Sequence, residues 1–144
     1  MNKQNLHSDN YLEAFYDKKL NLVELYWKEP TEDMTEAEYR MIISDISDEI
    51  HKIVEQGKQK APNWLLDNRK FMFTMSPKLQ EWQADKIFGP LLELGCRKGA
   101  VVMSEDLISQ FAIEQTFEEN SEARLATQYF GNLEQANVWL QEVD

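Results

Sequence analysis

Apolar and polar positions alternate near the start of the chain and predict a β-hairpin. The segments "YLEAFY" (residues 11–16) and "LNLVELYW" (residues 20–27) both show the two-residue period of half-buried strands. Only Asp17, Lys18 and Lys19 separate them, a spacing that suits a tight turn.

A long helix is predicted next. Thr35 and Glu38 form a capping box, in which each side chain satisfies a free backbone N–H at the helix start. Apolar residues then recur at three- and four-residue steps, which predicts one buried stripe. Gly57 is expected to end the helix in a left-handed conformation. The stripe consists of Tyr39, Ile42, Ile43, Ile46, Ile50, Ile53 and Val54.

Further strands are predicted at "NWLLDNR" (63–69), "GAVVMS" (99–104) and "ARLATQYF" (123–130). Helices are predicted between and after them. One begins with Ser76 as N-cap and Pro77 in the first helical position, and the pair at 89–90, Gly-Pro, is expected to interrupt it. Another spans 104–120.

The last helix is predicted from the segment "FGNLEQANVWL" (130–140). Asn132 is expected to cap it, with Gln135 three residues on. An apolar face is expected to cover the sheet, and it consists of Leu133, Ala136, Trp139 and Leu140.

This order of elements, ββαβαβαβα, predicts an α/β fold. After the opening hairpin, alternating strands and helices build a mostly parallel sheet, here five-stranded. We expect a disordered polar head at residues 1–10 and a single domain at residues 11–144.

Composition and net charge limit the classes of molecule that the chain is expected to bind. Apolar residues make up 42% of the chain and charged residues 28%, which is globular composition. The net charge of −11 disfavours nucleic acid and anionic membrane surfaces. No apolar run has the length of about 20 residues that membrane insertion needs. With Cys96 as its one cysteine the chain fits a reducing compartment, so a cytoplasmic location is expected, and a homodimer stays open.

The sequence offers few candidate catalytic residues, and an enzyme is the least supported class of protein. The histidines, His7 and His51, fall in the polar head and on a solvated helix face, and no catalytic or metal-binding motif occurs. We expect no metal and no cofactor. Arg97 and Lys98 favour a thiolate at Cys96, but a lone structural cysteine explains the residue better. Residues 67–69 (Asp-Asn-Arg), which follow the central strand, are best explained as a strand-end salt bridge or turn.

The chain resembles a known family in two passages. The strand-ending Phe130, the turn and the Leu, Ala and Trp-Leu positions of the last helix resemble the end of SpoIIAA-like proteins of the STAS/CRAL-TRIO-like fold. The passage "W-K-x-P…T-x-x-E-Y" from Trp27 to Tyr39 is also similar, and the element order matches over residues 11–143.

The STAS side of the resemblance implies a protein-interaction module related to anti-sigma-factor antagonists. Those proteins carry Asp-Ser-Ser-Gly-Leu at a helix start, and the second Ser is phosphorylated. When Leu79 is placed on that Leu, Met75 falls on the Asp, Ser76 on the first Ser, Pro77 on the phosphoacceptor and Lys78 on the Gly. Because proline has no hydroxyl, the switch does not carry over, and Ser76 is a helix cap at the family's switch position. Asp is expected to replace it without loss.

The CRAL-TRIO side implies binding of an apolar small molecule. Five apolar residues fall in connections after predicted strands, where such side chains are uncommon: Phe71, Met72, Phe73, Met75 and Met103. They either pack under neighbouring helices or line a ligand groove at the carboxyl edge of the sheet, where open α/β sheets bind their ligands. An apolar ligand and a protein partner therefore remain equal alternatives for a non-enzymatic domain.

Overall fold

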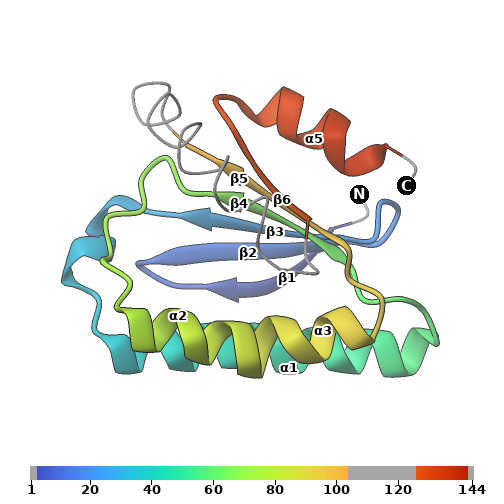
Figure 1. Cartoon of the computed structure of the whole chain (residues 1–144), viewed down its shortest axis with the longest axis horizontal. Coiled ribbons are helices and arrows are strands. Elements are labelled where there is room, and N and C mark those ends of the chain that lie inside the picture. Colours follow the sequence, from blue (N-terminus) through green and yellow to red (C-terminus); the bar gives the residue numbers. More distant parts are fainter. Residues whose placement is uncertain (1–2, 104–125, 143–144) are drawn as a thin grey trace.

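The fold is a mixed β-sheet with helices on both faces. We analysed a computed structural model, which describes residues 3–103 and 126–142. Its six-stranded sheet follows chain order, with antiparallel pairing at the first two junctions and parallel pairing at the other three (Figure 1). The strands are β1 (Lys3–Ser8), β2 (Leu12–Asp17), β3 (Leu22–Trp27), β4 (Asn63–Asp67), β5 (Lys98–Val102) and β6 (Ala126–Phe130).

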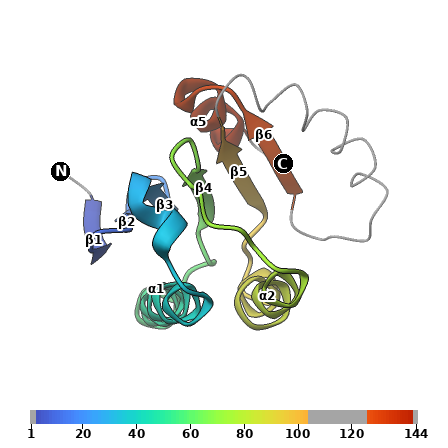
Figure 2. The ribbon, with the colours of Figure 1, turned by 90° about the vertical axis from the view of Figure 1, so that its left-hand side faces the viewer.

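Two long helical segments cover one face of the sheet and the C-terminal helix covers the other (Figure 2). The first face carries α1 and a continuous run of three shorter pieces, α2, η2 and α3. The helical elements are η1 (Glu29–Asp33), α1 (Glu36–Gly57), α2 (Pro77–Gln83), η2 (Ala84–Phe88), α3 (Gly89–Glu93) and α5 (Leu133–Gln141). The helix predicted at 104–120 lies outside the described residues.

The predicted α/β class is correct, whereas the predicted count of five strands and the disordered head are wrong. Lys3–Ser8 form β1, which pairs antiparallel with β2 and precedes the expected hairpin. The segment can be polar because it lies at the sheet edge, where four of its six residues are exposed and two are half-buried. Its ladder hydrogen bonds come from the backbone, which no side-chain pattern records.

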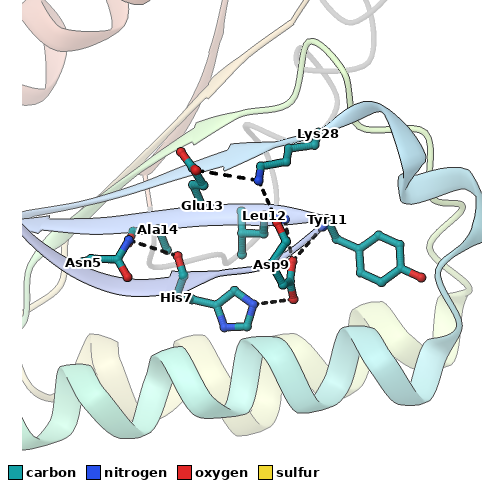
Figure 3. A network of polar contacts seen from close by, with 8 residues as sticks. All are labelled: Asn5, His7, Asp9, Tyr11, Leu12, Glu13, Ala14 and Lys28. Carbon is teal, nitrogen blue, oxygen red and sulfur yellow. Dashed lines mark hydrogen bonds and ion pairs between the residues drawn. The ribbon is translucent and has the colours of Figure 1, made fainter.

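Asp9 organises the turn that attaches β1. Its Oδ1 accepts hydrogen bonds from the backbone N–H groups of Tyr11 and Leu12, at 2.7 and 2.9 Å, and its Oδ2 lies 2.6 Å from His7 Nε2 (Figure 3). Lys28 donates to the Asp9 carbonyl at 2.7 Å and so ties the turn to the end of β3. Burial raises the pKa of Asp9. The hydrogen bonds of its carboxylate with His7, Tyr11 and Leu12 outweigh this effect and leave the pKa below its usual value of 3.8.

The predicted capping box of α1 is confirmed. Thr35 Oγ1 accepts from the Glu38 N–H at 3.1 Å, and the Glu38 carboxylate accepts from the Thr35 N–H at 2.9 Å. The end of the helix differs from the prediction. The residue in the left-handed conformation is Lys58, with φ 48°, rather than Gly57, because the helix runs one residue further before its last N–H returns to the Val54 carbonyl.

Gly89–Pro90 changes the helix type without ending the helix. An α-helical Pro90 would lack its N–H and press its ring against the carbonyl four residues earlier. The chain instead widens into the π-helical turn η2, in which the Gly89 N–H donates to the Ala84 carbonyl five residues back. α2 and α3 therefore lie along one line (Figure 1).

Two apolar cores flank the sheet. The larger lies between the sheet and the α1 and α2–α3 helices, and the smaller lies beneath α5, where Ala136 and Leu140 are buried. Asn132 caps α5 by accepting from the Gln135 N–H at 2.8 Å, as predicted. In the described ranges, none of the helices has the length and hydropathy required to cross a membrane.

Candidate functional site

The connection from β4 to α2 is fixed by backbone hydrogen bonds. Asn68 N–H donates to the Val102 carbonyl at 2.9 Å, which joins the carboxyl ends of β4 and β5. Phe71 N–H donates to the Asn68 carbonyl at 3.1 Å. The fully buried Thr31 accepts from the Met72 N–H at 2.8 Å. The connection therefore lies in a defined position over the edge of the larger core.

An aromatic cluster lies beneath this connection. The rings of Trp27 and Tyr39 stack with centroids 5.8 Å apart, and Phe71 packs on Trp27 at 4.7 Å. Phe73 stacks on Tyr39 at 5.4 Å with an interplanar angle of 11°. Strand β3, helix α1 and the connection thus each contribute rings to one contact region.

A cavity of about 110 Å³ adjoins the cluster, and we call it the aromatic cavity. It lies on the α1/α2 side of the sheet, near the carboxyl ends of β3 and β4. Its walls come from the sheet, both helical segments and the connection. They are formed by Leu25, Trp27, Tyr39, Ile43, Trp64, Leu66, Asn68, Phe71, Met75, Gln83 and Phe88.

Few polar groups line the aromatic cavity. Tyr39 donates its hydroxyl hydrogen to Gln83 Oε1, and burial raises the pKa of Tyr39 above its usual value. Two further polar atoms, Trp64 Nε1 and Asn68 Oδ1, are buried without a hydrogen-bond partner among the described residues. Gln83 directly precedes the π-helical turn and Phe88 is its last residue. Such turns frequently occur at functional sites.

The five predicted ligand-binding residues are only partly brought together. Phe71 and Met75 line the aromatic cavity, and Phe73 packs behind it on Tyr39. Met72 is 61% exposed, since alternate residues of the extended connection point away from the core. Met103 is buried at the end of β5 and is not part of the cavity wall. The second predicted wall, starting near residue 104, lies outside the described residues.

Sequence reasoning missed several residues of the cavity. Trp27, Tyr39 and Trp64 read as ordinary strand or helix core positions, and Gln83 reads as a surface residue. They come from four separate elements, so no spacing along the chain relates them. The one available signal was Asn68, which follows a central strand in the place where α/β sheets carry functional groups.

The neighbouring Asp67–Arg69 pair is a strand-end salt bridge, as the sequence indicated. Arg69 Nε and Nη2 donate to the two carboxylate oxygens of Asp67 at 2.9 and 2.7 Å. The pair borders a polar hollow of about 190 Å³ on the other face of the sheet, beside Tyr26 and Lys28. Both carboxylate oxygens of Asp67 therefore accept from Arg69 in a bidentate ion pair.

Cys96 is a fully buried thiol. Burial raises the pKa of Cys96 to about 11, and the opposing effect of Arg97 is smaller. The thiolate considered from the sequence is therefore disfavoured. Across the residues that the structure describes, His, Cys, Asp and Glu side chains form no group of three or more that has the arrangement of a metal site.

Comparison with known proteins finds no matching family model, no matching curated protein and no matching solved structure.

Proposed function

We propose that this chain is a non-enzymatic binding domain that holds a small apolar molecule in the aromatic cavity. The cavity itself is the observation that carries the proposal. Its walls are mostly apolar and aromatic with a few polar groups, which is the usual character of a small-molecule site. Its position near the carboxyl ends of β3 and β4 agrees with where open α/β sheets bind ligands.

The size of the cavity restricts the ligand. Drug-sized ligands occupy pockets of about 300–1,000 Å³, whereas the aromatic cavity measures about 110 Å³. A dry engineered cavity of about 150 Å³ holds benzene. A single ring therefore fits when the half-buried Phe71 and Met75 shift slightly, and a long acyl chain does not.

The walls offer no group for general acid–base chemistry. Among the described residues that line the cavity, Tyr39 is the one ionisable residue, and its hydroxyl donates a hydrogen bond to Gln83. Burial raises its pKa, so the phenol stays neutral at neutral pH. This supports binding rather than catalysis at this site.

We propose further that the chain is a SpoIIAA-like domain located in the cytoplasm. The β2–β3 hairpin, the alternation of strands and helices and the buried free thiol support this. The alternative function is a protein-interaction module related to anti-sigma-factor antagonists, without the phosphorylatable serine.

Toluene binding tests the proposed function. At ten times its dissociation constant, toluene should stabilise the protein by about 1.4 kcal/mol, measured by thermal shift and calorimetry. Met75→Asp should abolish this effect because it places a charge in the cavity wall. Met72→Asp is the matched control, since Met72 lies on the same connection with its side chain exposed. No stabilisation, or equal stabilisation of Met75→Asp, would overturn the proposal.

A further inference from the structure

Two residues that line the aromatic cavity, Trp64 and Asn68, each carry a buried polar atom without a hydrogen-bond partner among the described residues. Trp64 is only 1% exposed, and its indole N–H has no acceptor among the described residues. Asn68 Oδ1 is buried and has no hydrogen-bond donor within residues 3–103 and 126–142. Leaving a buried polar atom without a partner is unfavourable, and about nine in ten buried polar atoms have a partner. One donor and one acceptor, carried by two residues of the same cavity wall, therefore point to a ligand that supplies both partners.

The backbone holds these two groups at opposite ends of an apolar floor. Trp64, Leu66 and Asn68 follow the two-residue period of β4 and its extension, and all three line the cavity. Four residues at about 3.3 Å each separate the Trp64 and Asn68 Cα atoms by about 13 Å. The Trp64 ring is fixed by an edge contact with Phe88, with centroids 5.2 Å apart. The Asn68 backbone is fixed by its hydrogen bonds to β5 and to Phe71.

We propose that the ligand is a neutral one-ring molecule with polar groups at opposite ends, one accepting from Trp64 Nε1 and one donating to Asn68 Oδ1. This rests on the proposed function and specifies its ligand class. The ring lies over Leu66 beside the aromatic cluster. An anionic ligand is disfavoured because none of the residues in the cavity wall is cationic.

Three probes of nearly equal size test this ligand class on the intact chain. Hydroquinone carries a hydroxyl at each end, p-cresol carries one hydroxyl, and p-xylene carries none. In calorimetric titrations each hydrogen bond should raise affinity about three- to tenfold, which gives the order hydroquinone, p-cresol, p-xylene. Equal affinity for the three probes would overturn the inference.

Two variants assign the hydrogen bonds. Trp64→Phe removes the indole N–H and keeps an aromatic ring against Phe88, and Asn68→Leu removes the amide at similar volume. Because both residues line the cavity, the readout is the ratio of hydroquinone to p-xylene affinity, which each variant should lower about three- to tenfold. Retained p-xylene binding also shows that the variant is folded. If either variant does not fold, the order of the three probes on the wild-type chain remains decisive.

A spectroscopic measurement follows the donor directly. The Trp64 indole N–H resonance should move further downfield with hydroquinone than with p-xylene, because only hydroquinone supplies an acceptor. An unchanged resonance would indicate that a buried water satisfies the indole, and would overturn the inference.

If toluene binds and hydroquinone does not, the inference fails and the proposed function stands. If neither toluene nor any of the three probes binds, both fail.

Discussion

At the scale of one residue, Asp9 stabilises the turn that joins the polar edge strand β1 to β2. Its carboxylate accepts hydrogen bonds from two backbone N–H groups and contacts His7, so the turn between β1 and β2 depends on a charged acceptor. The pKa of Asp9 is lowered in the folded state, hence the folded protein holds this proton less tightly than the unfolded chain. The carboxylate therefore stabilises the fold above pH 3.8, and this contribution is lost as the pH falls through the folded pKa.

Asp9→Asn should reveal this contribution. The amide oxygen still accepts from the turn N–H groups but carries no charge, so the variant should be less stable than wild type at pH 7, by about 0.5–1 kcal/mol for a partly exposed carboxylate. The difference, measured by urea unfolding, should shrink as the pH falls below 3.8. Asp9→Ala also loses the turn acceptor and should stay destabilised at every pH. A pH-independent gap for Asp9→Asn would contradict the assignment.

Ser76 acts at the scale of elements, since it connects the start of α2 with the start of α1. Its Oγ accepts from the Leu79 N–H at 3.1 Å, as a helix cap does, and it also donates to Glu36 Oε1 at 2.6 Å. The sequence predicts the first contact and not the second, which joins residues 40 positions apart. The expectation that Asp replaces Ser76 without loss is therefore revised.

Three substitutions at Ser76 should separate these contacts. Ser76→Ala should cost about 1 kcal/mol through the lost cap. Ser76→Asn should be close to wild type, because its amide both accepts from Leu79 and donates to Glu36. Ser76→Asp should be less stable than Ser76→Asn, because it places two carboxylates together. Denaturant midpoints at constant m-value measure the order, and equal midpoints for Asp and Asn would show that Glu36 is irrelevant.

At the scale of the whole molecule, α5 closes the second face of the sheet. Leu140 is 7% exposed and lies in the smaller core, while Trp139 is only partly buried against Phe130. Lys98 donates to the carbonyl oxygens of Trp139 and Glu142, at 3.0 and 2.7 Å, which fixes the end of the helix to β5. The buried leucine, more than the tryptophan, should therefore determine how strongly α5 is attached.

Leu140→Ala should lower the free energy of unfolding by about 2–5 kcal/mol, because it leaves a cavity under α5. Trp139→Ala should cost less, since part of its ring is already in water. Val138, which is 60% exposed on the same helix, gives the control, and Val138→Ala should stay within about 0.5 kcal/mol. Chemical unfolding of the three variants measures this, and a larger loss for Val138 than for Leu140 would refute the orientation of α5.

The sequence by itself determined the elements whose stability is local. The capping box at Thr35 and Glu38, the Ser76 cap and the alternation in the hairpin depend on neighbours within a few residues, so they were predictable. The α/β class followed from the order of those elements. Apolar side chains in a connection also drew attention to Phe71 and Met75, which line the aromatic cavity, and their role in ligand binding stays a prediction.

Tertiary structure alone decided the rest. β1 exists because a partner strand offers its backbone, and the helix passes Pro90 because packing against the sheet favours a π-helical turn over a break. The aromatic cavity arises where β3, β4, α1, α2, η2 and the β4–α2 connection meet without filling the space between them. Its shape, and the unpartnered atoms of Trp64 and Asn68, depend on distances between residues far apart along the chain, which no local pattern encodes.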